Sequence, residues 1–170
     1  VIIHINSKGI SKTEIDKEVF LECEAGENWD SFVEYCISEG LSGVECLSGI
    51  PGSVGATPIQ NVGAYGQEVK DVIRSVKCIN TKNNEIKIFT NRDCEFDYRQ
   101  SRFKGEDKGK YIITSVVFNF QKNKEPKIKY PELQKQIESN PEFNNSNDLI
   151  EKLSIIRKTV ISIRKSKSMV

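Results

Sequence analysis

Residues 48–66 combine the residue types and spacings best suited to holding a ligand. The run reads SGIPGSVGATPIQNVGAYG, and the wider stretch 40–66 holds seven of the eleven glycines. Glycines let backbone N–H groups approach an anion that a Cβ would hold off, and Ser53 and Thr57 add hydroxyl groups. No Gly-Lys-Ser/Thr follows the glycines at 49–55, so the run is neither a P-loop nor the Rossmann fingerprint. Two interpretations remain open: a phosphate-binding loop, or an ordered turn-rich loop without a ligand.

A second patch, FDYRQSRFK at residues 96–104, interleaves cationic and aromatic side chains. Such a patch is compatible with a solvated turn in front of the apolar segment at 111–120. An arginine in it could instead hold a carboxylate through its planar guanidinium fork and stabilise developing negative charge. The residue types alone do not separate a surface turn from a substrate-binding loop.

Both segments resemble one enzyme family. Residues 40–68, GLSGVECLSGIPGSVGATPIQNVGAYGQE, closely resemble the signature of the UDP-N-acetylenolpyruvoylglucosamine reductases, and residues 98–104 are similar to that family's Tyr-Arg-x-Ser-x-Phe-Lys motif. The resemblance extends over almost the whole chain, although only these two motifs are specific. It implies a loop that lies along the pyrophosphate and isoalloxazine of FAD. The residues it places against the cofactor are Pro51, Gly52, Ser53, Gly55, Asn61, Gly63, Ala64 and Ile113.

The resemblance also implies roles on the substrate side. Arg99 would be the catalytic arginine and Tyr65 would lie near the substrate, whereas salt-bridge or surface roles are expected for Arg102 and Lys104. Ile113, without the resemblance, is simply a core residue of a strand.

Two later residues have a family role and an ordinary alternative. Tyr130 is similar to a tyrosine that closes over the substrate in one branch of the family, and Lys167 is similar to a diphosphate-binding lysine at the basic end of a helix. Taken alone, Tyr130 is a tyrosine at a helix entry. Lys167 is then an ordinary cation that complements a helix C-terminus.

The family reduces UDP-N-acetylglucosamine enolpyruvate to UDP-N-acetylmuramate in peptidoglycan precursor synthesis, with NADPH as co-substrate and FAD carrying the hydride. Its upstream FAD loop, its proton-donating serine and a later glutamate have no counterpart among these residues. We therefore expect an internal fragment that is inactive by itself. Two alternatives stay open: a flavoprotein oxidase with a related FAD-binding fold, and a non-catalytic nucleotide-binding module.

The elements that must position these residues follow from periodicity. Branched and alternating residues predict strands at 1–6, 17–24, 71–80, 85–90 and 111–120, with a further short strand possible at 10–15. The turn residues at 82–84 predict a hairpin between two of them. Because the connections read as hairpins rather than regular βαβ units, we expect an α+β fold with a mainly antiparallel sheet and flanking helices.

Helical spacing of Trp29, Phe32 and Cys36 predicts a helix over 29–39 that ends at Gly40. Pro131 opens a short helix, and apolar spacing predicts a longer one over 147–164. The resemblance implies the second subdomain of a PCMH-type FAD-binding fold in residues 1–146. Residues 147–170 would begin the substrate-binding domain.

The composition limits the kinds of partner that the protein is expected to bind. In 170 residues, Lys and Arg total 25 and Asp and Glu total 24, which gives a net charge of only +1. A charge this small does not favour binding to nucleic acid or to an acidic membrane. The five cysteines are scattered without a C-x-x-C pair, which predicts buried reduced thiols, no metal site and a reducing, cytoplasmic compartment. No apolar run approaches the ~18 residues of a membrane span. A monomer that binds a small-molecule substrate is expected.

Overall fold

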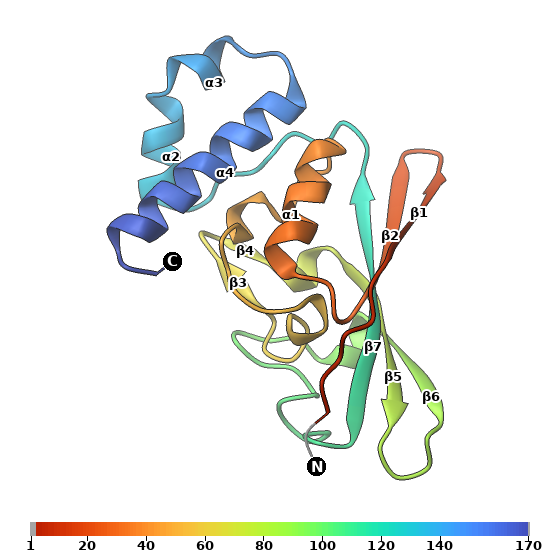
Figure 1. Ribbon diagram of the computed structural model, residues 1–170. Helices are drawn as coiled ribbons and strands as arrows, with labels where there is room; N and C mark the ends of the chain where they lie inside the picture. The colour runs from red at the N-terminus through yellow and green to blue at the C-terminus, as the bar shows by residue number, and fades with distance from the viewer. Residues whose placement is uncertain (1–2, 170) are drawn as a thin grey trace.

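The structure is a computed structural model that describes residues 3–169. Its central element is a five-stranded antiparallel sheet (Figure 1). Its strand order is β1-β2-β7-β5-β6, and every neighbouring pair is antiparallel. The strands are β1 (Ile10–Ile15), β2 (Glu18–Glu24), β5 (Ile73–Asn80), β6 (Ile86–Thr90) and β7 (Tyr111–Gln121). The predicted α+β class with a mainly antiparallel sheet is confirmed.

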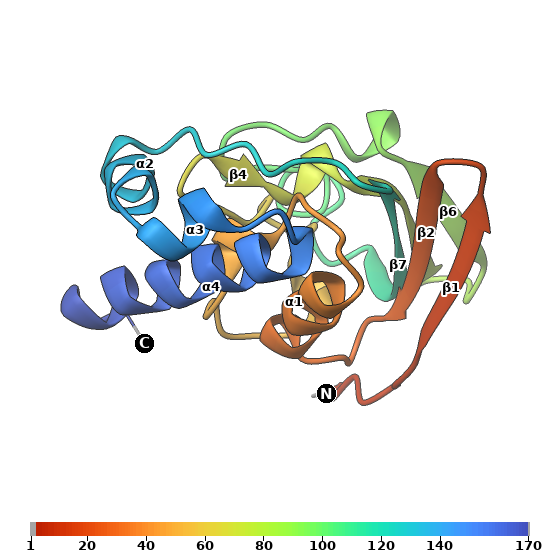
Figure 2. The same ribbon diagram turned by 90° about the horizontal axis from the view of Figure 1, so that it is seen from above.

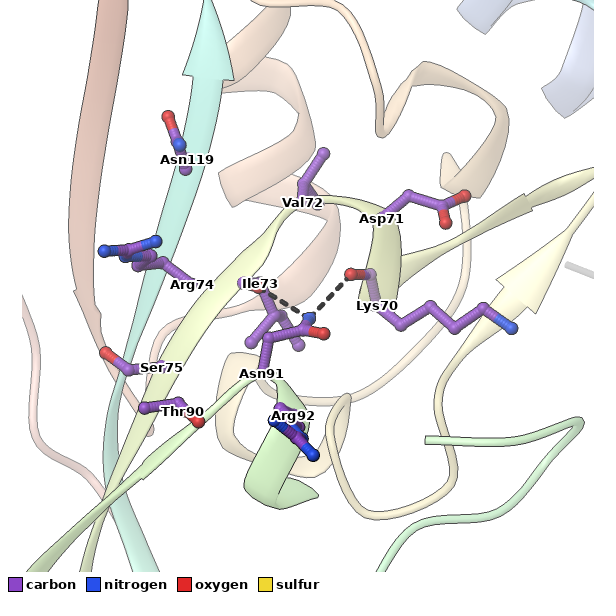
Figure 3. A pocket seen from close by; sticks show the side chains of 10 residues that line it. All are labelled: Lys70, Asp71, Val72, Ile73, Arg74, Ser75, Thr90, Asn91, Arg92 and Asn119. Carbon is purple, nitrogen blue, oxygen red and sulfur yellow. Dashed lines mark hydrogen bonds between the residues drawn. The ribbon is translucent and has the colours of Figure 1, made fainter. Parts of the chain in front are cut away.

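The central strand β7 is also the longest, and its buried residues alternate with less buried ones except at Ser115 and Val116, which are both buried. This period of two fixes the register, because a slip by one residue would turn the apolar side chains of β7 to the other face. A bulge beside Arg74 interrupts the pairing of β5 with β7. Asn91 stabilises this bend by donating its side-chain N–H groups to the Lys70 and Ile73 carbonyls, both at 2.8 Å (Figure 3).

The strand predicted at residues 1–6 is wrong for residues 3–6, which form no strand, and residues 1–2 lie outside the described part. Here the backbone instead lies across the turn after β2. A Cβ on Gly26 would come within 2.6 Å of the Ser7 carbonyl oxygen, so only glycine permits this approach. The other predicted strands, including the short one at 10–15, are present with ends shifted by one or two residues.

Helix α1 (Trp29–Ser38) covers one face of the sheet. The Asn28 side chain caps it by accepting from the Ser31 amide at 3.0 Å. Phe32 packs against Phe118 of β7 with ring centroids 4.5 Å apart, and the Trp29 indole donates to the Leu47 carbonyl at 3.1 Å. The helix predicted at 29–39 is therefore confirmed, and it couples the sheet to the loop that follows.

The glycine-rich loop, residues 40–71, contains no long helix or strand, as predicted for residues 48–66. Its regular pieces are η1 (Glu45–Leu47), η2 (Val54–Ala56), η3 (Val69–Asp71) and the small hairpin of β3 (Gly63–Ala64) with β4 (Gln67–Glu68). Buried polar groups hold it together. The Glu45 carboxylate accepts from the Gly43 amide at 2.6 Å and from the Gln67 side chain at 2.8 Å. Such paired buried groups make a loop without regular structure rigid.

Three C-terminal helices form the outermost layer (Figure 2). They are α2 (Pro131–Glu138), α3 (Pro141–Asn145) and α4 (Leu149–Ser166). The helices opened by Pro131 and predicted over 147–164 are present, whereas α3 was not predicted. Helix α4 contacts both α1 and η1, so the glycine-rich loop lies between the sheet and the C-terminal helices. The domain boundary at 146/147 stays a prediction.

Ion pairs from Arg157 of α4 to Asp30 and Glu34 of α1 join these layers. Arg157 of α4 donates to both carboxylate oxygens of Asp30 in α1, at 2.6 and 2.8 Å, and the same carboxylate accepts from the Gly49 amide at 2.6 Å. These contacts, led by the hydrogen bonds from Arg157, hold the pKa of Asp30 below its ordinary value. The carboxylate therefore links α1, the loop and α4.

All five cysteine thiols are free and buried. Burial raises the pKa of each of them, since a thiolate is poorly solvated among apolar neighbours. The predicted buried, reduced thiols are confirmed.

Replacing Asp30 by alanine is expected to lower the free energy of unfolding by about 2 kcal/mol, because it leaves Arg157 without its bidentate partner. Urea denaturation measures the change. As a control, Glu125→Ala removes the exposed partner of Lys152 and should cost less than about 0.5 kcal/mol.

The effect of Asp30→Ala should depend on pH. Because the folded state lowers the pKa of Asp30, its contribution is fully present above the unfolded value of about 3.9. It is lost as the pH falls through the folded value. An equal difference between wild type and variant at neutral pH and below pH ~2 would contradict the role given to this carboxylate.

Candidate functional site

Arg99 lies in a tight, exposed turn between β6 and β7. Asp97 and Gln100 exchange backbone hydrogen bonds of 3.0 and 3.1 Å, which leaves Tyr98 and Arg99 at the turn. Arg99 has a left-handed backbone with φ 53°. Within residues 3–169, no hydrogen bond or ion pair occupies its exposed guanidinium. The group is therefore available to an anion.

The Asn61 side chain ties this turn to the glycine-rich loop. It is fully buried and donates to the Asp97 carbonyl at 3.0 Å and to the Glu68 carboxylate at 3.2 Å. Its oxygen accepts from the Lys70 amide at 3.1 Å. The structure thus uses this amide, predicted to line the cofactor, to position the turn that carries Arg99.

Ser101 makes a second anchor on the other side of Arg99. Its buried hydroxyl donates to the Ile59 carbonyl at 2.7 Å and accepts from the Phe103 amide at 3.2 Å. The arginine turn is therefore fastened to the glycine-rich loop at both ends.

The two other cations of the motif have structural contacts. Arg102 pairs with Glu106 at 2.8 Å and with Asp107 at 2.6 Å, and Lys104 donates to the Arg99 carbonyl at 2.9 Å. The expected salt-bridge and surface roles for Arg102 and Lys104 are confirmed.

A cavity of about 360 Å³ adjoins the Arg99 turn, and we call it the arginine pocket. It brings together six residues singled out from distant parts of the sequence. The lining comprises Gly63, Ala64, Tyr65, Arg99, Tyr130 and Lys167, together with Ile50, Arg164 and Met169. Its cations make it suited to a ligand that carries negative charge.

Tyr65 and Tyr130 form one wall of the arginine pocket. Their rings meet edge to face with centroids 5.2 Å apart and an angle of 83°. Lys167 lies 5.9 Å from the Tyr130 ring centroid and forms an ion pair with Glu132. The hydrogen bond that Lys167 donates to the Glu132 carboxylate raises the pKa of Lys167, so this lysine stays charged at neutral pH.

Arg164 is a pocket residue that the sequence analysis missed. Its side chain is only 8% exposed, and its Nη2 donates to the Met169 carbonyl at 3.0 Å. Its Nε has no hydrogen-bond partner among residues 3–169. The available signal was its spacing of three residues from Lys167, because residues three apart share one face of a helix.

Two residues that line the arginine pocket, and the Asn61 anchor beside it, have an unusual backbone conformation. Asn61, Tyr65 and Arg99 all have left-handed backbones, with φ of 43°, 50° and 53°. Residues other than glycine rarely adopt this left-handed backbone conformation. Those that adopt it are often found at functional sites.

A second cavity, of about 430 Å³, contains the other group of predicted residues, and we call it the isoleucine pocket. Ser53, Gly55 and Ile113 line it. Gly55 is required by packing, because a Cβ there would meet the Ala25 Cβ at 2.6 Å. Most of the predicted site residues are thus divided between two cavities, one charged and one mainly apolar, whereas Pro51, Gly52 and Asn61 line neither.

Pro51 and Gly52 are exposed beside Ser53, outside the lining of both cavities. Gly52 has φ 125°, and no atom lies within 4 Å of where its Cβ would be. Within residues 3–169, the Gly52 and Ser53 amides and the Ser53 hydroxyl have no acceptor. Free amides on an open glycine backbone fit the phosphates of a dinucleotide such as FAD.

A third cavity, of about 580 Å³, contains none of the predicted residues (Figure 3). It lies beside the bulge in β5 and is lined by residues of η3, β5 and β7 and by the end of β6 with Arg92, which follows that strand. Among residues 3–169, no cluster of three or more His, Cys, Asp or Glu side chains could hold a metal ion. In the same part of the chain, no helix has the length and apolar character that crossing a membrane requires.

The part of the chain that contains the glycine-rich loop matches a known protein family. A family model described as an FAD binding domain matches residues 1–89. The chain belongs to this family. The match covers the glycine-rich loop but ends before the Arg99 turn.

Two similar curated proteins bear the same name. The chain is 46% identical over 134 residues to UDP-N-acetylenolpyruvoylglucosamine reductase of Neisseria meningitidis serogroup C, covering 78% of the chain and 39% of that protein. It is 42% identical over 171 residues to the reductase of Thermobifida fusca, covering 99% of the chain and 46% of that protein. The resemblance stated from the two motifs is thereby confirmed.

A solved structure supports the fold. UDP-N-acetylenolpyruvylglucosamine reductase from Thermus caldophilus matches with a TM-score of 0.56 and 23% identity, covering 83% of this chain and 41% of that one. The chain spans less than half the length of the relatives it matches.

The Asn61→Asp substitution is expected to loosen the Arg99 turn. The new carboxylate would face the Asp97 carbonyl and Glu68, two acceptors, and the free energy of unfolding should fall by about 2–3 kcal/mol. Hydrogen exchange should accelerate at the amides of residues 98–104.

Asn144→Asp is the matched control, because Asn144 is an exposed asparagine that donates to the Glu138 carbonyl. It should change stability by less than about 0.5 kcal/mol and leave exchange in the turn unaltered. Unchanged protection of the turn in Asn61→Asp would refute the anchoring role.

Proposed function

We propose that this chain is the FAD-binding part of a UDP-N-acetylenolpyruvoylglucosamine reductase, which uses NADPH to reduce UDP-N-acetylglucosamine enolpyruvate to UDP-N-acetylmuramate. The observation that carries the proposal is the arginine pocket, where Arg99, Lys167, Tyr65 and Tyr130 meet beside the glycine-rich loop. The names of the similar curated proteins support it. A non-catalytic nucleotide-binding module would have no use for the cationic arginine pocket.

Bound FAD would supply the hydride chemistry, and the chain would hold it. The free amides of Gly52 and Ser53 would donate to its phosphate oxygens. Gly55 and Ile113 would border its apolar portion in the isoleucine pocket. Pro51 stiffens the loop in front of these amides, which lowers the entropy lost on binding. Gly63 and Ala64 line the arginine pocket and would bring the cofactor and the substrate together.

The cations of the arginine pocket would bind the substrate. The Arg99 guanidinium can hold the enolpyruvyl carboxylate with two parallel hydrogen bonds and stabilise the negative charge that develops beside it. Arg164 lies in the last turn of α4 and Lys167 caps the end of that helix, and both would face the diphosphate. Tyr65 and Tyr130 would cover the substrate and exclude water. Asn61 and Ser101 would keep Arg99 in place.

In the intact enzyme, Arg99→Lys is expected to lower turnover by about 10²–10³ while FAD stays bound. Lysine keeps the charge but loses the planar fork, and removing one such donor typically costs ~3–4 kcal/mol of transition-state stabilisation. Stopped-flow measurements should find flavin reduction by NADPH unaltered and the step with the enolpyruvyl substrate slowed.

Arg92→Lys provides the control, because Arg92 is an exposed arginine that lines the third cavity and not the arginine pocket. It should leave both half-reactions unchanged. If Arg99→Lys turns over substrate at the parent rate, Arg99 is an ordinary surface residue and the proposed role is wrong.

The 170-residue chain by itself should not catalyse the reaction, because it spans less than half the length of its relatives. Purified chain supplied with FAD, NADPH and UDP-N-acetylglucosamine enolpyruvate should show no substrate-dependent NADPH oxidation. Oxidation at the rate of an intact reductase, measured in parallel, would refute this.

The buried thiols suit a reducing compartment, and we place the protein in the cytoplasm as a monomer.

A further inference from the structure

Residues 3–9 are held against the body of the protein although they form no strand with the sheet. Lys8 donates to the Gly26 carbonyl and pairs with Glu27 at 3.7 Å. The Gly9 amide donates to Glu27 at 2.8 Å, and the Gly9 carbonyl accepts from the Glu24 amide at 3.0 Å. These contacts fix Lys8 and Gly9, where the segment joins β1. Gly26 has no Cβ, which leaves room for the backbone of residues 5–7.

This placement directs Ile3 and Ile5 to the isoleucine pocket. Both line it, together with Ile59, Ile112 and Ile113. Ile3 remains 61% exposed and Ile5 36% exposed. Exposed apolar side chains scattered singly need no explanation, but a group of them around one cavity marks a surface that something covers.

We propose that the segment 3–9 forms one wall of the flavin-dinucleotide site, and that Ile3 and Ile5 contact a planar ring system of the cofactor. This inference rests on the proposed function. The two isoleucines are additional cofactor-binding residues, outside the glycine-rich loop and read in the sequence as part of a plain strand.

The chemistry of the isoleucine pocket fits a flat aromatic ring that is joined to phosphate. Its volume of about 430 Å³ lies within the usual range for small-molecule sites, and most of its walls are apolar. Ser53 and Lys108 provide its polar edge. Among residues 3–169 the Lys108 ammonium has no ion-pair partner, so it is available to a phosphate. A ring between isoleucines with its phosphate toward Ser53 and Lys108 would use both kinds of surface.

Calorimetric titration of the 170-residue chain with FAD, FMN and AMP tests the inference. Ile3→Ser and Ile5→Ser should each weaken FAD binding about tenfold, because each removes apolar contact with the ring. FMN and AMP show which of the two rings is involved, since only the one that enters this pocket should lose affinity in the variants. Ile15→Ser is the matched control: Ile15 is 57% exposed on β1 and does not line the pocket. It should bind like the wild type.

The outcomes are separable. If the wild-type chain binds FAD and the variants at Ile3 and Ile5 bind it equally well, the inference is overturned while the proposed function stands. If neither the chain nor the intact enzyme binds FAD at about 1 mM, both are overturned. Circular dichroism should be the same for all variants, because the substituted side chains are largely exposed.

Discussion

The carboxylate of Asp30 is the contact on which the arrangement of the layers depends. It receives the Gly49 amide from the loop and the Arg157 guanidinium from α4, while its own helix packs on the sheet. Exposed ion pairs contribute little to stability, but a bidentate pair that also accepts a backbone amide defines an orientation. Arg164 follows Arg157 by two helical turns and so lies on the same face of α4. The rotation of α4 that Asp30 fixes therefore decides whether Arg164 faces the loop.

Asn61 and Ser101 perform the corresponding task for the opposite wall. The cations of the arginine pocket repel one another when no anion is present, and the strained turn at Arg99 adds a further cost. Buried side-chain hydrogen bonds offset both, because breaking them would leave unsatisfied polar groups in the interior. The site is thus rigid before a ligand arrives, which reduces the entropy lost on binding.

Much of this structure could be predicted from the sequence, and the failures have physical causes. The helix at Trp29 and the strand at 111–120 follow from side-chain periodicity, which reports burial directly. Residues 3–6 have the same branched composition as a strand, yet their apolar side chains face a cavity and their backbone passes over Gly26. Composition does not distinguish a residue that covers a ligand from one that covers a core.

The site shows the same division. The glycines and Arg99 were identified because their types and order are distinctive. Arg164 was missed because a basic residue near a helix end has an ordinary electrostatic explanation. The burial of Asn61 could not be anticipated either, since its partners at Glu68 and Asp97 come from a tight turn and a tiny hairpin that no periodic pattern announces.

The burial of the cysteines also has a practical consequence. With every thiol enclosed and its pKa raised, a water-soluble alkylating reagent has almost nothing to react with while the chain is folded. Each thiol lies in the same hydrophobic core, which includes the sheet, α1 and the start of the glycine-rich loop. The kinetics of alkylation would therefore measure how often this core opens, and the protein needs no added label for that measurement.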